Sequence, residues 1–314
     1  MVKNYPMNIP FVKFRKIYFV FSGILILGSI TSLVIFGLKP GIDFTGGSIL
    51  EIEYKTQRPE NKVIRESLAN LDLGEISIQP ADEKGVILRM KDIPEDIHQQ
   101  ISEKLRGTGD FEEKRFETIG PTIGKELKEK TKIVVVISLF AMVFYIAIAF
   151  KRVSRPISSW QYGIASLLML SHDILIPLGV FAVLGKYYQV QITIPVITAF
   201  LTIVGYAINN VVVVYDRIRE NLLRERLTFE EIVEKAINQT LTRQLNTSLT
   251  TLFPLFFIFF LGGETLKYFA LTLILGIAAG TYSSIFLASP ILVSWLRWRS
   301  RSAGSSGSTA SAKR

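Results

Sequence analysis

Long apolar runs separated by charged stretches dominate the hydrophobic pattern of this chain. Six runs are long enough, or nearly so, to cross a hydrocarbon core, which takes roughly 20 helical residues. Polar residues are scarce inside each run, and this pattern is typical of an α-helical membrane protein with several spans. The predicted transmembrane helices are residues 17–36, 131–150, 163–184, 192–215, 245–261 and 268–296.

The first run follows basic residues, as the hydrophobic part of a cleavable signal peptide would. It is too long for such a peptide, and no small-residue cleavage site follows it. We therefore expect a retained transmembrane helix at 17–36, preceded by a cytoplasmic N-terminal segment at 1–16.

Basic residues at alternate ends of the spans predict the orientation of the chain, because short loops rich in Lys and Arg stay in the cytoplasm. Such residues precede the first span, follow the second and fourth spans, and recur in the tail at 297–314. The other short loops hold only Lys186 and Lys267. Both termini should be cytoplasmic, and residues 37–130 should lie outside. Apart from those in the 216–244 loop, the basic residues of the predicted cytoplasmic segments are Lys3, Lys13, Arg15, Lys16, Lys151, Arg152, Arg155, Arg297, Arg299, Arg301, Lys313 and Arg314.

The outer segment 37–130 has the pattern of a small α/β domain. Strands are indicated where apolar and polar residues alternate, and helices where apolar residues recur on one side. The predicted order is β-α-β-β-α-β, the split βαβ arrangement of ferredoxin-like domains. Its elements are a strand at 48–54, a helix at 59–71, strands at 75–79 and 86–90 joined by a turn at 81–85, a helix at 94–105 and a strand at 111–119.

Two segments outside the spans have their own patterns. Residues 228–240, within the cytoplasmic loop 216–244, place apolar side chains on one helical face and predict an interfacial or docking helix. The tail at 297–314 is rich in Ser, Gly and Ala toward its end and is predicted to be disordered.

Composition narrows the possible functions. The chain has 314 residues, 49% of them hydrophobic, with no cysteine and two histidines, His98 and His172. These counts exclude thiolate sites and a His-rich metal centre. The net charge is +9, but the basic residues mostly flank apolar runs, so membrane lipids explain the charge better than nucleic acid does. An enzyme is the weakest hypothesis, because no Ser/His/Asp set, metal cluster or nucleotide loop is present.

Polar residues inside membrane spans are costly and therefore mark candidate sites. His172 and Asp173 lie inside the third predicted span, and Asn210 lies inside the fourth. Desolvation opposes the charged form of a buried aspartate while a nearby cation favours it, a competition that suits a group that loads and unloads protons. For Asp216, at the water boundary, we favour pairing with Arg217 and a packing role.

The motif GIDFTGG at 41–47 directly follows the first span. Gly41, Gly46 and Gly47 have neither a Walker lysine nor a following helix, so they do not predict a phosphate-binding loop. Together with Asp43 they are expected to form a tight structural turn from the span into the first strand.

Four motifs resemble the SecD/SecF family of protein-export membrane proteins, and three of them resemble its SecF branch. The first is GIDFTGG, and the others are GYAINNVVVVYDRIREN at 205–221, NQTLTRQLNTSLTTL at 238–252 and GTYSSIFLASP at 280–290. They occur in order at suitable spacing, and the resemblance covers the chain apart from the tail. It implies a six-helix core like that of the resistance-nodulation-division exporters.

The resemblance implies an accessory subunit of the Sec translocase in the bacterial inner membrane. With SecD, such a subunit couples the proton gradient to preprotein translocation through SecYEG. YajC and the YidC insertase are further partners that the resemblance allows. No cofactor is implied, because the proton gradient is the energy source.

One residue departs from the family pattern. Where this chain has Asn210 the family commonly has Asp, and Asn cannot titrate. The substitution is either natural, with an aspartate of SecD carrying the proton, or an engineered neutral replacement. The resemblance makes Arg243 the best candidate for a countercharge, and a contact between Asn210 and Arg243 is a hypothesis. Two other functions stay open: a scaffold that stabilises SecD or an insertase, and an exporter-type half-transporter for small molecules or lipids.

Overall fold

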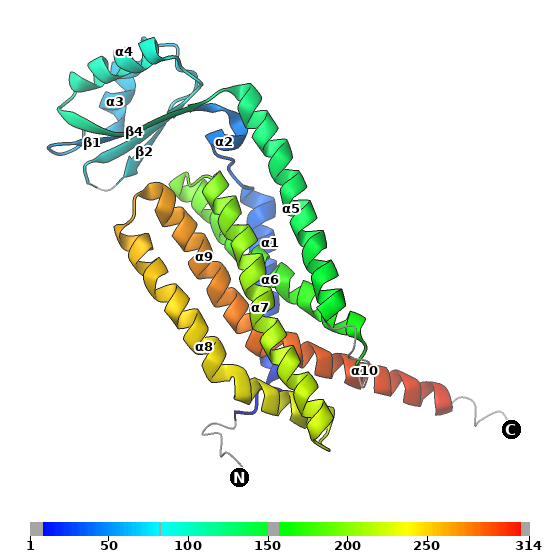
Figure 1. Cartoon of the computed structure of the whole chain (residues 1–314). Coiled ribbons are helices and arrows are strands. Elements are labelled where there is room, and N and C mark those ends of the chain that lie inside the picture. Colours follow the sequence, from blue (N-terminus) through cyan, green and yellow to red (C-terminus); the bar gives the residue numbers. More distant parts are fainter. Residues whose placement is uncertain (1–8, 82, 150–156, 309–314) are drawn as a thin grey trace. The chain divides into compact units, whose positions relative to one another are not determined.

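The computed structural model describes residues 9–81, 83–149 and 157–308 (Figure 1). The chain divides into two compact units. The helical unit comprises Met1–Ile35, Ile137–Val180 and Pro195–Arg314, and the sheet unit comprises Phe36–Val136 and Phe181–Ile194. Some sequence expectations concern residues outside this description: residue 82 of the turn, residue 150 of the second span, residues 309–314 of the tail, and the basic residues Lys3, Lys151, Arg152 and Arg155.

Long helices make up most of the described chain. Five stretches are long and apolar enough to cross a membrane by length and composition: Arg15–Phe36, Trp160–Tyr188, Ile194–Arg224, Phe229–Leu261 and Leu266–Arg299. The helices are α1 (Arg15–Phe36), α5 (Pro121–Ala149), α6 (Ser159–Tyr188), α7 (Ile194–Arg224), α8 (Phe229–Leu261), α9 (Glu264–Ser283), the π-helix η1 (Ser284–Ala288) and α10 (Ser289–Ser308).

Helix α5 contains the predicted second span and is not among those five stretches. Its apolar part begins at Ile133 and the described helix ends at Ala149, so the end of the predicted span lies outside the description. Several side chains on this part of α5 are exposed, including Phe140 at 72%, whereas Leu139 and Met142 pack against the core of the helical unit.

The predicted amphipathic helix and the predicted fifth span form one 33-residue helix, α8. The helix is continuous because no Gly or Pro occurs before Pro254. It begins with a capping box, in which Thr228 Oγ1 accepts the Glu231 N–H (3.3 Å) and the Glu231 carboxylate accepts the Thr228 N–H (2.9 Å). Its predicted apolar face is buried in the core of the helical unit: Phe229, Ile232, Val233, Ala236 and Ile237.

The C-terminal part of the chain differs from expectation. Disorder was predicted from residue 297, but α10 continues to Ser308. No proline follows Pro290, so nothing in the sequence forces the helix to end earlier.

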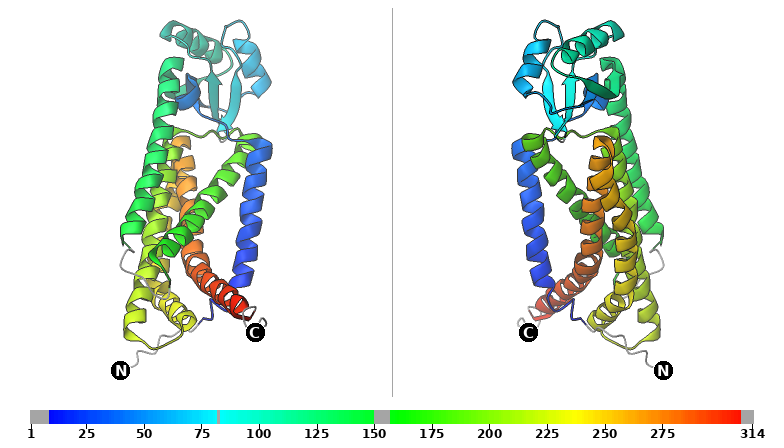
Figure 2. Two further views of the ribbon diagram at one scale, coloured as in Figure 1. Left: turned by 90° about the vertical axis from the view of Figure 1, so that its right-hand side faces the viewer. Right: turned by 90° about the vertical axis from the view of Figure 1, so that its left-hand side faces the viewer.

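Helix α1 contacts the rest of the helical unit through two buried serines and through the rings of Tyr18 and Phe21. Only Ser22 and Ser29 of its described residues are buried. At Ser29 the approach to α6 is so close that a Cβ on Gly179 would lie 2.5 Å from the Ser29 Cα. Figure 2 shows α1 at the edge of the helical unit, with most of its surface uncovered by other described helices.

The sheet unit contains four antiparallel strands in the order β2-β3-β1-β4. Figure 1 shows α3 and α4 over the same face of the sheet. Side chains that alternate along β1, such as Leu50 and Ile52, pack with Ile64 of α3 and Ile101 of α4. The elements are β1 (Gly47–Tyr54), α3 (Asn61–Leu68), β2 (Ser77–Ala81), β3 (Gly85–Met90), α4 (Glu95–Arg106) and β4 (Phe111–Ile119).

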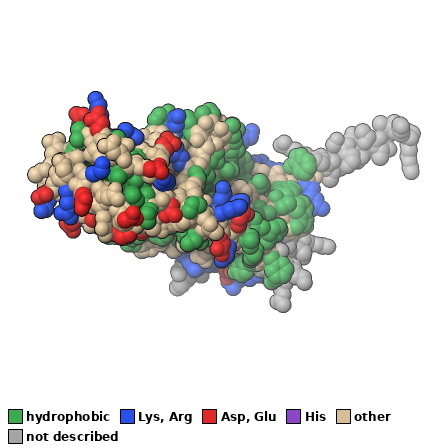
Figure 3. Space-filling view, turned by 90° about the horizontal axis from the view of Figure 1, so that it is seen from above, with side chains coloured by type: hydrophobic (Ala, Val, Ile, Leu, Met, Phe, Trp, Pro, Cys, Tyr) green, Lys and Arg blue, Asp and Glu red, His purple; other side chains and the backbone are tan. Residues whose placement is uncertain are grey.

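The opposite face of the sheet carries a smaller apolar cluster. Ile49 and Ile87 pack there with Ile42 of the short helix α2 (Ile42–Thr45). Over the surface seen in Figure 3, acidic and basic side chains of the sheet unit are interspersed, with no large field of one sign.

Candidate functional site

A buried ionisable cluster lies where α6 meets α9. His172 and Asp173 are 1% and 0% exposed, and His172 Nδ1 lies 2.9 Å from Asp173 Oδ1. The Ser283 hydroxyl donates to Asp173 Oδ2 at 2.9 Å. Gly280 lies beside the carboxylate, and a Cβ there would be in ordinary contact with Asp173 Oδ2 at 3.4 Å. Both oxygens of the aspartate therefore have protein partners, as a carboxyl group in this setting requires.

Further hydroxyl and amide groups continue from this cluster toward α8. Ser284, next to Ser283, donates to Gln244 Oε1 at 2.6 Å, and Gln244 Nε2 donates to Thr240 Oγ1 at 3.2 Å. All three groups are buried. A second pair, Ser248 and Thr281 at 2.6 Å, joins the same two helices, and the Tyr206 hydroxyl of α7 donates to Ser248 at 3.1 Å.

Tyr282 links the cluster to α1. Its hydroxyl donates to the Tyr18 carbonyl at 3.2 Å and accepts from the Ser22 hydroxyl at 3.2 Å. Its ring stacks on the His172 ring, with centroids 5.9 Å apart and an interplanar angle of 25°. The same side chain thus contacts α1 and the partner of Asp173.

Two buried nitrogen atoms in the helical unit have no hydrogen-bond partner within the described part of the chain. They are His172 Nε2 and Asn210 Nδ2. Unpaired buried polar groups are rare and often mark ordered water or function. Two of the residues that the sequence singled out are thus buried and still able to donate or accept a hydrogen bond.

The structure does not bring every sequence candidate into this cluster. Arg243 is exposed on α8 and forms no ion pair with a described residue, and no hydrogen bond joins it to the buried Asn210. Asp216 is exposed and pairs with Arg219 at 2.8 Å, not with Arg217 as expected. Arg217 instead pairs with Glu220 at 2.7 Å.

Within the sheet unit, the GIDFTGG motif forms a compact turn. Gly46 and Gly47 have φ values of 74° and 131°, which side-chain-bearing residues rarely adopt. Space is also restricted, because a Cβ on Gly46 would lie 2.7 Å from the Pro121 Cα. Gly41 donates its N–H to the Ile192 carbonyl at 2.7 Å.

Asp43 of this motif has a role that the sequence did not reveal. Its Oδ2 accepts the Ile194 N–H at 2.8 Å, at the first residue of α7. The first N–H groups of a helix lack partners within the helix, so Asp43 acts as a cap supplied from another segment.

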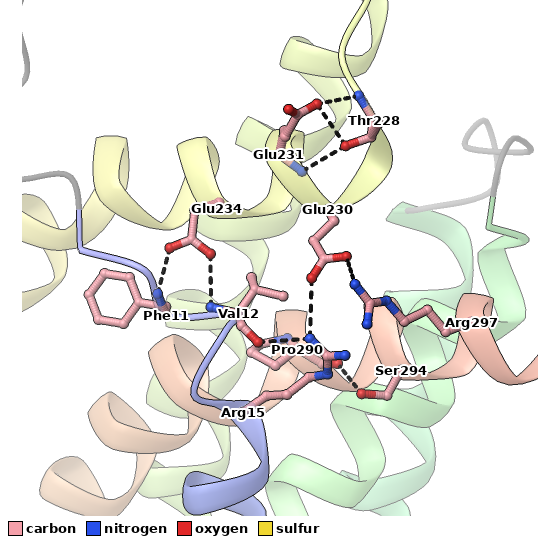
Figure 4. A network of polar contacts seen from close by, with 10 residues as sticks. All are labelled: Phe11, Val12, Arg15, Thr228, Glu230, Glu231, Glu234, Pro290, Ser294 and Arg297. Atoms are coloured by element: carbon pink, nitrogen blue, oxygen red, sulfur yellow. Dashed lines mark hydrogen bonds and ion pairs between the residues drawn. The ribbon is translucent and has the colours of Figure 1, made fainter.

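A second polar network ties the N-terminal segment to α8 and α10 (Figure 4). The Glu234 carboxylate accepts the N–H groups of Phe11 and Val12, the latter at 2.8 Å. Glu230 pairs with Arg15 at 3.2 Å and also with Arg297. Burial raises the pKa of the Glu234 carboxyl, and the two N–H groups partly offset this effect.

No described group of three or more His, Cys, Asp or Glu side chains could hold a metal ion. The residues that sequence reasoning missed are Ser283, Tyr282, Ser284 and Gln244. Their only signal in the sequence was that they are polar residues in or beside apolar spans, within motifs that carry the resemblance.

Fold and site together define a multi-span membrane protein with an ionisable cluster among its helices and a small antiparallel sheet domain after the first span. Residues 100–298 match the family model "Protein export membrane protein SecD/SecF, C-terminal", and residues 31–57 match the "SecD/SecF GG Motif" model. The chain belongs to the SecD/SecF family of protein-export membrane proteins, and within it to the SecF subunits. This family consists of accessory subunits rather than enzymes.

The alignments with similar proteins extend over nearly the whole chain. The protein translocase subunit SecF of Thermobaculum terrenum is 37% identical over 302 residues, covering 91% of this chain and 94% of the relative. The SecF of Rhodothermus marinus is 39% identical over 298 residues, covering 91% of this chain and 92% of the relative. The crystal structure of SecDF from Thermus thermophilus, a translocon-associated membrane protein, matches with a TM-score of 0.82 and 31% identity. That match covers 94% of this chain but only 40% of the SecDF chain.

Proposed function

We propose that this chain is an accessory subunit of the Sec translocase that, together with SecD, couples the proton gradient to preprotein translocation. The observation that carries the proposal is Asp173, which is 0% exposed and hydrogen-bonded to both His172 and Ser283 inside the helical unit. A carboxyl group at such a depth changes its hydrogen-bonding role when it gains or loses a proton. It can therefore convert proton uptake into a change of helix packing.

An exposed polar face on α7 and α8 supports SecD as the partner. Asn209 of α7 and Arg243, Asn246 and Thr250 of α8 are exposed, and the Tyr206–Ser248 hydrogen bond holds the two helices together. Polar and charged side chains that face lipid are costly, by about 2.5–3.5 kcal/mol for a charge at the centre of a membrane helix on insertion scales. A partner helix that offers polar or acidic groups would remove this cost. The likeness to SecDF favours SecD as the source of that helix.

The finer architecture belongs to the same proposal. We take α5 as a transmembrane helix in addition to the five stretches above, which brings the number of spans to six. We take the sheet domain as ferredoxin-like, because its strand order and its β-α-β-β-α-β sequence fit that class. Both termini are cytoplasmic in this arrangement, and the sheet domain is extracytoplasmic, as the distribution of basic residues favours. SecYEG, the translocating preprotein and, in a wider assembly, YajC and YidC are the remaining proposed partners.

The test is preprotein translocation into inside-out vesicles that carry this chain with SecD, with and without a proton gradient. We expect Asp173→Asn to abolish the gradient-dependent part and to leave the ATP-driven part intact. Asn210→Asp is the companion variant. If it raises gradient-dependent export, position 210 is a titrating site and the present chain is a neutralised form. Gradient-dependent export that is unchanged in Asp173→Asn would remove this aspartate from the mechanism.

The second candidate is a scaffold that stabilises SecD without proton coupling. Asn210 favours it, because this buried residue cannot titrate where the family commonly has an aspartate. A scaffold would keep SecD abundant in the membrane, and export would show the same gradient dependence with the parent chain, Asp173→Asn and Asn210→Asp.

A further inference from the structure

Three consecutive side chains where α9 meets η1 contact three different helices. Tyr282 reaches α1 through Tyr18 and Ser22, Ser283 reaches α6 through Asp173, and Ser284 reaches α8 through Gln244. Successive residues of a helix point about 100° apart, so a run of three can face three neighbours. The site of Asp173 is thereby connected to both α1 and α8 through adjacent residues.

The helix changes type at this point. Residues Ser284–Ala288 form the π-helix η1 between α9 and α10. Such turns are rare and frequently lie at functional sites, where the wider turn leaves backbone groups available to other partners. Here the Tyr215 hydroxyl donates to the carbonyl of Ala288, the last residue of η1, at 3.3 Å.

Each serine of the run has one hydroxyl hydrogen and two acceptors within reach. The Ser283 hydroxyl lies 2.9 Å from Asp173 Oδ2 and 3.2 Å from the Gly280 carbonyl. The Ser284 hydroxyl lies 2.6 Å from Gln244 Oε1 and 3.0 Å from the Thr281 carbonyl. A hydroxyl donates only one hydrogen, so each serine has two alternative hydrogen-bonded states.

We propose that Tyr282, Ser283 and Ser284 form a junction that transmits the protonation state of Asp173 to α1, with Tyr282 as the residue that positions α1. The inference rests on the proposed function and names the route by which the cluster acts. While Asp173 is a carboxylate, Oδ2 accepts the Ser283 hydrogen. A proton taken up on Oδ2 turns that oxygen into a donor, and Ser283 then accepts from Asp173 and donates to the Gly280 carbonyl.

Few described side chains lie close enough to Asp173 to take part in this exchange of hydrogen bonds. His172 on α6 is the ionisable residue hydrogen-bonded to it, and Tyr282 on α9 stacks on His172. From α7, Ala207 lies beside Gly280 and carries no charge. The Gly280 carbonyl belongs to the last α-helical turn before η1, so its new bond acts on the segment that carries Tyr282.

Helix α1 is suited to respond because few of its described residues are buried. Ser22 and Ser29 are its buried residues, and Ser22 is the one bonded to Tyr282. The chain runs from α1 directly into the GIDFTGG motif and the sheet domain. A shift of α1 therefore reaches that domain through the covalent chain.

The test uses spin labels on the full chain, assembled with SecD in lipid nanodiscs. The chain lacks cysteine, so paired cysteines can be placed at Ile24 on α1 and Leu223 on α7, which are 64% and 84% exposed. We expect the distance between the labels to differ between mildly acidic and neutral pH in the parent, and to be insensitive to pH in Tyr282→Phe, which keeps the ring and loses the hydroxyl. Tyr206→Phe is the matched control, because it removes a hydroxyl bonded to Ser248 and not to α1.

The outcomes distinguish a failure of the junction from a failure of the proposed function. In the translocation assay, Tyr282→Phe should lose the gradient-dependent part and keep the ATP-driven part, whereas a purely structural role would lower both. If Tyr282→Phe retains the pH response of the parent while Asp173→Asn lacks it, the junction is wrong and the proposed function stands. If Asp173→Asn also responds like the parent, both are wrong. Ser22→Ala, which removes the same link from the α1 side, should weaken the pH response, and an unchanged response would count against the junction.

Discussion

Asp43 and Ile194 are 151 positions apart in sequence, yet the Asp43 carboxylate accepts the Ile194 N–H at 2.8 Å. A motif that follows α1 thereby caps the first turn of α7, the helix that carries Asn210. We expect Asp43→Ala to destabilise this turn by about 1 kcal/mol, as loss of a cap does elsewhere. Hydrogen exchange at the amide of Ile194 measures the effect. Asp43→Asn keeps an acceptor oxygen and should exchange nearly like the parent, and equal rates in all three proteins would contradict the capping role.

Gly179 permits the close approach of α6 to α1. Its Cβ would lie 2.5 Å from the Ser29 Cα, so Gly179→Ala must separate the two backbones. Overpacking of this kind typically costs about 1–3 kcal/mol. We expect a lower thermal unfolding temperature of the purified protein. Gly28→Ala on α1 is the control, since nothing lies within 4 Å of its Cβ, and similar effects of the two changes would show that the contact is unimportant.

Glu234 holds the N-terminal segment through two backbone N–H groups. Hydrogen bonds to a charged acceptor contribute about 1.5–3 kcal/mol, more than those to a neutral one. Glu234→Gln should therefore loosen residues 9–14 and speed proteolysis there at least several-fold. Glu231→Gln, one helical turn away, should leave that rate unchanged, because Gln also serves in a capping box. Equal cleavage of both variants would argue against the clamp.

The capping box of α8 should be sensitive to acid. Hydrogen bonds from the Thr228 hydroxyl and the Thr228 N–H hold the pKa of the Glu231 carboxyl below its usual range. The folded state therefore binds this proton less readily than the unfolded state does. The stabilisation is present above the ordinary glutamate pKa and is lost as the pH falls through the lowered value. Carboxyl ¹³C titration should show the depressed pKa in the parent and a less depressed one in Thr228→Ala, which loses the hydroxyl and keeps the N–H.

Arg243 is exposed on α8 and forms no ion pair within the described chain. If SecD supplies its partner, Arg243→Ala should impair gradient-dependent export while the protein still folds and inserts. Arg224→Ala is the control, because this residue lies at the end of α7 and pairs with Glu220 on its own helix. Normal secretion with Arg243→Ala would remove the residue from the mechanism.

The elements of the sheet domain could be predicted closely because they depend on local patterns. The strand at Phe111–Ile119 has the predicted bounds, and the neighbouring elements differ by a few residues. In α8, by contrast, hydrophobic periodicity separated an amphipathic helix from a span, although no residue between them breaks the helix. Periodicity reports which side is buried and not where a helix stops.

The site was predictable only in part. His172 and Asp173 could be identified because polar groups inside a span are costly. Ser283 could not, because its bond to Asp173 joins residues 110 positions apart and a serine in a span can satisfy itself on its own backbone. For Asp216, sequence proximity suggested Arg217, but side chains three or four positions apart are neighbours on a helix, and Arg219 is the partner.

The π-helix η1 also constrains how this chain can change over evolutionary time. A π-turn holds one residue more than an α-turn, so deleting one residue from Ser284–Ala288 would restore a continuous α-helix and remove the wide turn. Individual side chains in this stretch can be exchanged, but insertions and deletions here should be rare among relatives, because either would change the number of residues that the wide turn holds.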